Sequence, residues 1–557
     1  MERARRDHLL FFWFMPLFSL VFLIAAWLVG NPLPGLWSIW QTAAPFLTDP
    51  IATVGLSAAL FNSGTMGLLA WGALWLSRSR PTGRAFAPFF LCMGAGLLGG
   101  DLLSGLPITL GGFLYAALRK EPPAKSVLFA LYGCALSPAV ASFYMGLHGP
   151  TPWSIVLGLL LAVFIGFLCT PLTLGIRPLH HGFNLHSMGI PLGVISVVLY
   201  AVYRSAILHM VSWTDTQNLP LLLGASQHAF FYPFFAFLFL ALLFLGRAMR
   251  RPQDPAYKEL FAHSGLEADF ISLFGMANVF QNMGLMGLMF LAYFFLISAP
   301  FNGAAASALL FALCWSAAGA HPRNTAPILV TYSLMSLLPG LNLNAPELVV
   351  GVGFAVGLAP IYGRLGWAYG LLASGLHACL MPLVLHTGGG FNLATGALAA
   401  GIVALALYPI LSQQARRQEE GPVHAAHASV ASELLHSAAH IVDGMDEALS
   451  HVADPAAAAA PQPHKELFLL LRNIFACIAA GLFLLTLLPL SFVSHSHVLR
   501  FAAYILGALA YGSEILALTH GFHKKQPLEE MLMPYLFGVL YIALAVSYTH
   551  LTLPTIA

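Results

Sequence analysis

The residues of this chain that are best placed to do chemistry are a few ionisable and polar side chains inside long apolar stretches. They are Asp101, which follows Gly99-Gly100, and the group His321, Arg323 and Asn324, which follows Gly319-Ala320. A charge at bilayer depth is costly and usually marks a solute pathway, a proton relay or an ion pair. We therefore predict that Asp101 pairs with Arg323, or that Arg323 receives an anionic group with the help of helix N-termini. In the alternative interpretation, Arg323 is an anchor at the outer headgroups and His321 is hydrogen-bonded nearby.

Four asparagines occur in two repeated motifs. Asn62 and Asn282 each begin the pattern Asn-x-Gly-x-Met-Gly-Leu. Small residues let membrane helices approach closely, which favours a packing role for this pair over a role in binding. Asn184 and Asn392 each lie in the pattern Gly-Phe-Asn-Leu. They are either helix caps or symmetric donors and acceptors that line a pathway.

Histidines are the chain's most obvious candidate metal ligands. His180, His181 and His186 lie close together, but no second or third cluster of spaced histidines accompanies them. We therefore predict no catalytic metal and no cofactor, and single histidines stay candidates for a proton relay because they titrate near physiological pH. The glycine-rich phosphate loop of ATP-driven pumps does not occur in the sequence.

The composition requires a lipid environment for the elements that carry these residues. Of 557 residues, 59% are hydrophobic and 8% are charged, and the mean hydropathy is +0.80. A soluble domain carries about 25% charged residues and cannot hide this much apolar surface. The formal net charge of +2 and the lack of a basic patch argue against nucleic acid as a partner. We therefore predict an all-α polytopic protein whose partner is the lipid bilayer.

Stretches of about 20 apolar residues predict the membrane-spanning helices. Before residue 412 these are 9–30, 51–76, 125–148, 153–176, 182–203, 229–246, 270–298, 345–363, 367–386 and 389–411. Two further stretches, 85–118 and 301–338, are interrupted by glycine, proline and polar residues. We interpret them as broken or re-entrant hairpins, with two short spans each as the alternative. Lysine and arginine fall on the cytoplasmic loops if the N-terminus is cytoplasmic, which predicts that orientation.

The repeated motifs fall at a nearly constant spacing. Asn62 and Asn282 are 220 residues apart, as are Asp49 and Asp269, whereas the two Gly-Phe-Asn-Leu motifs are 208 apart. An odd number of predicted crossings separates the two starts, which turns the second copy upside down. Inverted repeats with paired interrupted helices are the build plan of many secondary transporters. We therefore expect two inverted copies, each with a polar-tipped hairpin, whose tips meet near the midplane.

The chain divides into seven segments. They are an N-terminal span with an outer segment (1–48), the first membrane repeat (49–228), a connecting span with a cytoplasmic loop (229–268), the inverted second repeat (269–412), a cytoplasmic linker with an amphipathic helix (413–465), a C-terminal transmembrane module (466–546) and a tail (547–557). The sequence Val-Ser-Tyr-Thr-His-Leu-Thr-Leu-Pro-Thr, which begins at Val546, reads as a translated sequencing adaptor. We therefore expect that the tail is not native and that the C-terminal module is truncated.

The order of the motifs resembles a family of uncharacterised bacterial polytopic membrane proteins, catalogued as a domain of unknown function. The features that carry the resemblance are Asn-x-Gly-x-Met-Gly-Leu, a glycine-containing break followed by Pro-Ile, and Gly-Phe-Asn-Leu, each present twice between about residues 10 and 412. The resemblance implies a location in the bacterial inner membrane and implies no activity.

These features favour transport of a small polar or anionic solute by a secondary transporter whose site lies between the two hairpins. The predicted substrate-binding residues are Asp101, His321, Arg323, Asn324, Asn184, Asn392, Asn62 and Asn282. The coupling ion, a proton or sodium, and a homo-oligomeric state are left open. A passive solute channel is one alternative, and a membrane-embedded enzyme that acts on a lipid-linked substrate is another.

Overall fold

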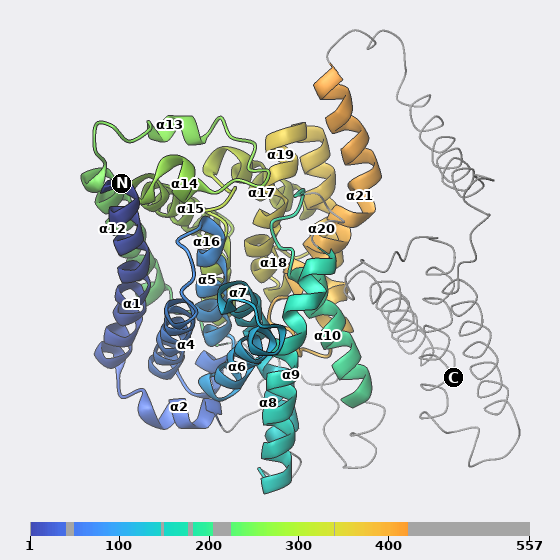
Figure 1. Cartoon of the computed structure of the whole chain (residues 1–557). Coiled ribbons are helices and arrows are strands. Elements are labelled where there is room, and N and C mark those ends of the chain that lie inside the picture. Colours follow the sequence, from blue (N-terminus) through green and yellow to red (C-terminus); the bar gives the residue numbers. More distant parts are fainter. Residues whose placement is uncertain are drawn as a thin grey trace, which may run out of the picture. The chain divides into compact units, whose positions relative to one another are not determined.

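The computed structural model describes residues 2–40, 49–145, 150–176, 182–203, 224–338 and 340–420 (Figure 1). Within these ranges the chain is helical and has no β-strand, so the predicted helical class is confirmed there. His180 and His181, the amphipathic helix expected in the linker, the C-terminal module and the tail lie outside the described residues. The chain divides after residue 406 into two compact units, and the packing described below lies within the first.

The described helices fall before and after the undescribed segment 204–223. Before it lie α1 (Glu2–Val29), α2 (Leu33–Trp40), α3 (Pro50–Thr53), α4 (Leu56–Leu76), α5 (Gly83–Leu97), α6 (Leu102–Arg119), α7 (Pro123–Gly133), the 3₁₀ helix η1 (Cys134–Leu136), α8 (Ser137–Met145), α9 (Pro152–Ile176) and α10 (Gly189–Val202). After it lie α12 (His228–Met249), α13 (Tyr257–Leu260), α14 (Phe270–Phe274), α15 (Met276–Leu296), α16 (Gly303–Leu313), α17 (Pro322–Met335), α18 (Pro346–Ala355), the 3₁₀ helix η5 (Val356–Leu358), α19 (Ala359–Leu365), α20 (Trp367–Thr387) and α21 (Thr395–Glu420). In this described part, nine helical segments are long and apolar enough to cross a bilayer, which makes the chain a multi-pass membrane protein.

Two long helices, α4 and α15, are each preceded by a short helix and a glycine. Gly55 and Gly275 have φ angles of 91° and 79°, a region that residues with a Cβ rarely adopt. Asp49 caps α3 and Asp269 caps α14, each through a side-chain oxygen that accepts a backbone N–H. The same turn therefore occurs twice, 220 residues apart.

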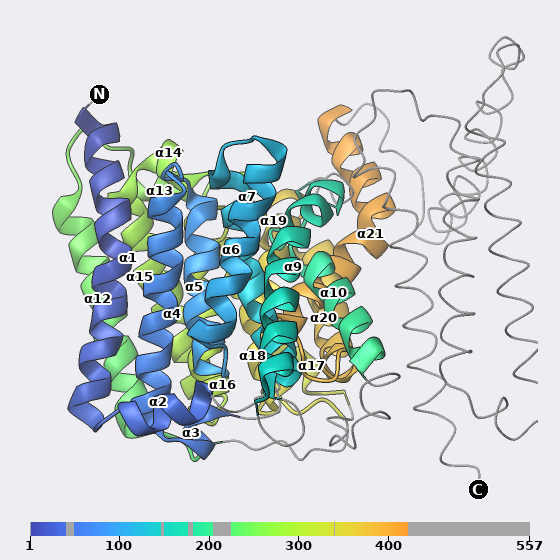
Figure 2. The ribbon, with the colours of Figure 1, turned by 60° about the horizontal axis from the view of Figure 1, so that its bottom comes forward.

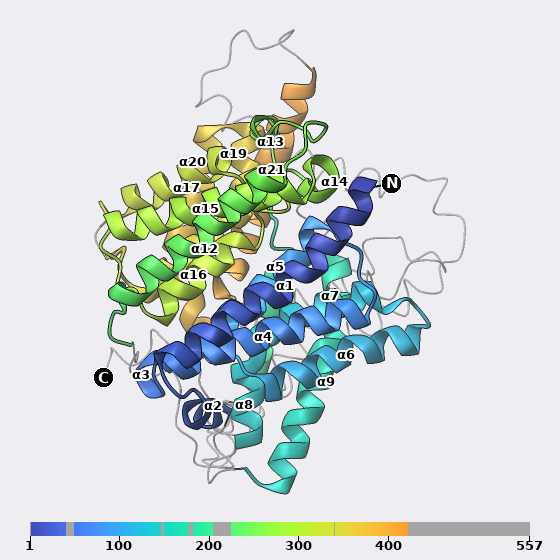
Figure 3. The same ribbon diagram turned by 90° about the vertical axis from the view of Figure 1, so that its left-hand side faces the viewer.

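The two long helices also pack on their partners in the same way. α1 lies along α4, and α12 lies along α15 (Figure 3). Glycines allow the close approach, because a Cβ at each would press on the facing helix. The facing pairs are Gly64 with Leu23, Gly67 with Ser19, Gly284 with Leu243, and Gly287 with Phe239. Each contact in the first pair of helices recurs in the second at an offset of 220.

The interrupted stretches form helix pairs, α5 with α6 and α16 with α17, but their breaks do not meet. Ser307 Oγ, near the start of α16, donates to Gly94 O near the end of α5, over 2.9 Å. Cys314 Sγ, just past the end of α16, lies 3.3 Å from Ala87 O near the start of α5. The two helices are therefore antiparallel, and the break that follows each lies at opposite ends of the pair. Since the 15 residues of α5 extend roughly 22 Å, the prediction that the tips meet near the midplane is wrong.

Two spans that the sequence predicts as continuous, 125–148 and 345–363, are broken inside the molecule. A 3₁₀ turn, η1 or η5, follows α7 or α18, and a proline, Pro138 or Pro360, begins the next helix. Proline cannot donate a hydrogen bond to the preceding turn, and a 3₁₀ segment within a helix often marks a hinge. These two stretches are also the most deeply buried of the candidate spans, where irregular backbone is shielded from lipid.

Charged residues link α1 to the loop before α13 at one face, which we call the N-terminal face; α2 and α3 lie at the opposite face (Figure 2). Arg6 Nη2 lies 3.2 Å from both carboxylate oxygens of Asp254. Arg3 Nε lies 3.6 Å from Asp7 Oδ2 and 4.0 Å from Asp254 Oδ1. Asp254 is buried, so this carboxylate is held by two guanidinium groups with little water around it.

The Asp254 contacts predict a pH-dependent stability. Burial acts to raise the pKa of the Asp254 carboxyl, but hydrogen bonds from the Arg251 N–H and from Arg6 outweigh it, and the pKa is held below its ordinary value of 3.8. A carboxyl whose pKa is lowered on folding stabilises the fold above its unfolded pKa, and this contribution is lost as pH falls through the folded pKa. We expect Asp254→Asn to lower the thermal midpoint at neutral pH, and the difference from the wild type to shrink below about pH 4.

Glu121→Gln is the matched control for Asp254→Asn. Glu121 is half exposed and its carboxylate lies 3.9 Å from Arg119 Nε, so its removal should change stability little at any pH. A deficit of Asp254→Asn that stays constant from neutral to acidic pH would contradict the assignment.

Candidate functional site

The two Gly-Phe-Asn-Leu loops dock on the two broken helices in a crossed arrangement. Leu185 N, in the first loop, donates to Gly357 O of η5 over 2.9 Å. Leu393 N, in the second loop, donates to Ala135 O of η1 over 2.8 Å. Each loop therefore satisfies a backbone carbonyl that the 3₁₀ turn of the other half presents.

Other contacts are exchanged between the halves in the same way. Asp49 Oδ2 accepts the Gly303 N–H over 3.0 Å, and Asp269 Oδ1 accepts the Gly83 N–H over 2.9 Å. Both members of the second pair are the first pair's residues shifted by 220, with the halves interchanged. Contacts in which residue i meets j and the counterpart of j meets the counterpart of i are the mark of a twofold relation.

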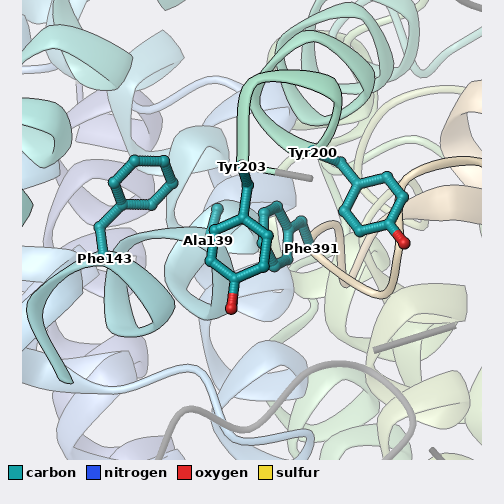
Figure 4. Close-up of a cluster of buried hydrophobic side chains, with 5 residues drawn as sticks. All are labelled: Ala139, Phe143, Tyr200, Tyr203 and Phe391. Atoms are coloured by element: carbon teal, nitrogen blue, oxygen red, sulfur yellow. The ribbon is translucent and has the colours of Figure 1, made fainter. Parts of the chain in front are cut away.

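The second loop is anchored by an aromatic side chain. Phe391 is fully buried, and its ring centroid lies 5.5 Å from that of Tyr200 and 5.2 Å from that of Tyr203, both edge to face. Ala139 and Phe143 of α8 complete this cluster (Figure 4). The loop that carries Asn392 is thus fixed to α8 and α10 of the first half.

A cavity of about 290 Å³ lies beside the first loop. Its walls come from both halves of the chain: Arg84, Lys125, Leu128, Phe129, Tyr132, Gly182, Asn184, Leu185, Ser187, Met188, Glu267 and Trp315. Lys125 and Glu267 are exposed, whereas Tyr132, Asn184 and Trp315 are buried. The cavity therefore has a charged mouth, with two cations and one carboxylate, and an aromatic floor with one amide.

His186 lies behind the cavity floor in a fixed protonation state. The indole Nε1–H of Trp315 donates to His186 Nδ1 over 2.9 Å, so Nδ1 carries no proton. The other ring nitrogen, Nε2, lies 2.9 Å from Phe354 O and donates to it. His186 is thus a neutral imidazole that joins the first loop to the end of α18, and it is fully enclosed rather than a free metal ligand.

The predicted residues Asn184 and Asn392 both turn their own loops, and only one of them reaches the cavity. Asn184 Oδ1 accepts the His186 N–H over 2.9 Å, and its amide Nδ2 donates to His186 O over 3.3 Å. Asn392 Oδ1 accepts the Ala394 N–H over 2.8 Å, and its Nδ2 is buried with no partner among the described residues. Asn184 lines the cavity, whereas Asn392 is fully buried.

Asn62 and Asn282 hold the breaks that follow α5 and α16. Asn62 Nδ2 donates to Gly96 O over 2.9 Å and to Gly100 O over 2.7 Å. Asn282 Nδ2 donates to the carbonyls of the residues 34 and 38 positions later, as Asn62 does. Both amides thus satisfy carbonyls that the helix ends leave without intrahelical donors, which fits the packing role.

The predicted group at the breaks acts locally. Asp101 is 1% exposed and caps α6, because its carboxylate accepts Ser104 N over 2.9 Å and Ser104 Oγ over 3.0 Å. Arg323 is exposed and its Nη1 lies 3.4 Å from Phe261 O. The expected Asp101–Arg323 pair does not form, because the two breaks lie at opposite ends of the α5–α16 pair.

His321 and Asn324 form a reciprocal cap at the start of α17. Asn324 Oδ1 accepts the His321 N–H over 2.9 Å, and His321 Nδ1 accepts the Asn324 N–H over 3.4 Å. His321 Nε2 also lies 2.9 Å from His263 O. These contacts use the polar atoms of both side chains within the break itself.

The sequence did contain a signal for the features that its analysis missed. Leu136-Ser137-Pro138 recurs as Leu358-Ala359-Pro360 at an offset of 222, and both mark the breaks in α7–α8 and α18–α19. Arg84 and Lys125 served only to orient the chain in the bilayer, and Glu267 and Trp315 had no assigned role. No local pattern connects these four residues, since three separate segments bring them together.

Comparison with known proteins identifies the family alone. No curated protein and no solved structure matches this chain. A family model described as a protein of unknown function, DUF1576, matches residues 30–205 and 254–413, and this covers most of the helical unit described above. The chain therefore belongs to the DUF1576 family of proteins of unknown function.

Proposed function

We propose that this chain is a secondary transporter for a small polar or anionic solute, built from two inverted copies of one helical unit. The contacts that recur at an offset of 220, and those exchanged between the halves, support a twofold relation. The antiparallel pairing of α5 with α16 supports inversion, because these helices hold equivalent places in the two copies. Since α12 packs on α15 as α1 packs on α4, the copies begin at α1 and α12, and α12 is not merely a connecting span.

The solute site in this proposal is the cavity at Asn184 rather than the hairpin tips. One observation carries the proposal: this cavity is walled by both copies and lies against a loop that docks on a broken helix of the other copy. Inverted-repeat carriers bind their substrates where the copies meet beside interrupted helices. Arg84 and Lys125 favour an anionic group on the solute, and the amide of Asn184 supplies a neutral donor.

The 3₁₀ turns give the proposed carrier its moving parts. η1 and η5 interrupt the two most buried spans, and each is held by a loop of the other copy through one backbone hydrogen bond. A single hydrogen bond contributes only about 1 kcal/mol, so each loop can leave its turn at small cost. A passive channel remains the alternative, and it needs no such hinge.

The orientation and location of the chain are part of the proposal. Arg78, Arg84, Lys125 and the Arg250-Arg251 pair belong to loops or helix ends that reach the N-terminal face. Positive residues accumulate on cytoplasmic loops, so the N-terminal face is assigned to the cytoplasm, and the membrane to the inner membrane of the cell.

Uptake into proteoliposomes tests the proposed site. The probes are radiolabelled acetate, succinate, glycine and phosphate, each with and without an imposed proton or sodium gradient. A charge-assisted hydrogen bond contributes about 1.5–3 kcal/mol, so we expect Arg84→Gln and Lys125→Gln each to reduce uptake of the transported probe by about tenfold or more. Arg119→Gln is the control, because Arg119 is exposed and pairs only with exposed Glu121.

The outcomes separate the candidate functions. Accumulation above the outside concentration under a gradient supports a carrier, whereas equilibration without accumulation supports a channel. Normal uptake by both cavity variants would remove the site. Turnover of a lipid-linked substrate without any gradient would instead support the enzyme alternative.

A further inference from the structure

Two polar side chains near the second loop are buried without hydrogen-bond partners among the described residues. They are Asn392, through its amide nitrogen Nδ2, and Thr395, through its hydroxyl Oγ1. Asn392 is 0% exposed and Thr395 is 1% exposed. An unsatisfied buried polar group costs about 1–3 kcal/mol, and most native groups avoid this cost. A state in which water or solute reaches these atoms would relieve it.

The counterparts of these residues lie at the cavity. Asn392 and Thr395 correspond, at an offset of 208, to Asn184 and Ser187, and both of the latter line the cavity. The amide nitrogen of Asn184 is hydrogen-bonded, so an unpartnered nitrogen is not inherent in the loop. Ser187 is half-buried, whereas Thr395 is enclosed.

The surroundings correspond as well. Tyr132 and Lys125 line the cavity on α7, and their counterparts on α18 at an offset of 222 are Phe354 and Glu347. In the second copy the space is filled, because a Cβ at Gly396, next to Thr395, would lie 2.7 Å from Phe354 Cβ. The second copy therefore holds the parts of a cavity in a closed form.

The closed region lies nearer the opposite face than the cavity does. Phe391 fixes the second loop to α8, which continues from η1 away from the N-terminal face (Figures 2 and 4). The open cavity has its charged mouth at the N-terminal face, with Arg84 at the start of α5 and Lys125 at the start of α7.

We infer that Asn392 and Thr395 line a second access cavity for the same polar solute, which opens to the opposite face when the cavity at Asn184 closes. Opening exposes the Asn392 amide and the Thr395 hydroxyl to water and solute. The mouth of this second cavity carries Glu347 in the place of Lys125. The inference rests on the proposed function, and it names the residues of the outward half of the pathway.

Cysteine labelling in vesicles tests the second cavity without knowledge of the solute. Ser187→Cys and Thr395→Cys are each placed in full-length protein whose six native cysteines are replaced by alanine. A membrane-impermeant maleimide is applied to right-side-out and to inverted vesicles. We expect Ser187→Cys to react at least tenfold faster from the N-terminal face, and Thr395→Cys at least tenfold faster from the opposite face.

Two further variants make the result decisive. Ala399→Cys, a fully buried position on α21, is expected to stay unlabelled from both sides, which excludes general unfolding as the source of labelling. Ser187→Trp fills the open cavity and hinders its closure, so it is expected to slow labelling of Thr395→Cys at least fivefold. An unchanged rate would show that the two openings are not exclusive, and it would overturn the inference.

The labelling pattern also separates the inference from the proposed function. If Ser187→Cys reacts and Thr395→Cys reacts from neither face, or only from the N-terminal face, the second cavity is wrong and the first stands. If Ser187→Cys reacts from neither face, the accessible solute site itself is wrong.

Discussion

Replacement of Asn282 by leucine is expected to lower the free energy of unfolding by about 2–6 kcal/mol, because it leaves two buried carbonyls without donors, at about 1–3 kcal/mol each. Asn282 Nδ2 donates to Ser316 O over 2.6 Å and to Ala320 O over 2.8 Å, and the residue is 0% exposed. Leucine has a similar volume, so the loss arises from the missing donors rather than from a cavity. The measurement is the denaturant or thermal unfolding of purified protein in detergent.

Two comparisons test this explanation of the Asn282 effect. Asn62→Leu removes the equivalent pair of hydrogen bonds, to Gly96 O and Gly100 O, and it should cost a similar amount. Tyr257→Phe removes the hydroxyl that donates to Asn282 Oδ1 over 3.1 Å but keeps both carbonyl contacts, and it should cost about 1 kcal/mol. Equal losses in Asn282→Leu and Tyr257→Phe would rule out the two carbonyls as the cause.

Gly166→Ala is expected to separate α6 from α9 and to destabilise the fold strongly. A Cβ at Gly166 would overlap the carbonyl oxygen of Ile108, and a Cβ at Gly111 would overlap that of Val163, so backbone meets backbone at this crossing. Backbone cannot rotate away as a side chain can, and overpacking of this kind typically costs about 1–3 kcal/mol and occasionally more. The expected result is a lower thermal midpoint and a smaller monodisperse fraction in size-exclusion chromatography.

The control for the crossing is Gly72→Ala on α4. A Cβ at Gly72 would have no atom within 4 Å, so alanine fits there and gains helix propensity of up to about 1 kcal/mol. We expect this variant to be as stable as the wild type or more stable. A Gly166→Ala protein that unfolds at the wild-type temperature would contradict the close contact between α6 and α9.

Several features of the fold could be predicted from the sequence because they depend on composition or on residue identity. Only 8% of the residues are charged, and this alone requires lipid around the helices. The spacing of 220 between Asn62 and Asn282 recurs in the structure, where both amides reach the carbonyls 34 and 38 residues further on. The positions of Gly55 and Gly275, each after a capped turn, follow the same spacing.

The candidate site was only partly accessible from the sequence. Asn184 was correctly singled out as a polar residue of a repeated loop, and it lines the cavity. Asp101 and Arg323 were paired because each follows a glycine break, but their breaks belong to antiparallel helices and lie apart. A motif shows which residues share a local geometry, and it carries no information on the direction in which two helices pack.

The sequence by itself determined the helical class, the bilayer environment, the repeat spacing and the caps, since each arises from residues close together in the chain or from average composition. Only the tertiary structure decided which loop meets which broken helix and where a cavity lies. Arg84, Lys125, Glu267 and Trp315 come from segments up to 231 residues apart, and they share one cavity because α5 and α16 pack antiparallel. That packing depends on the shapes of whole helix faces, which no short stretch of sequence specifies.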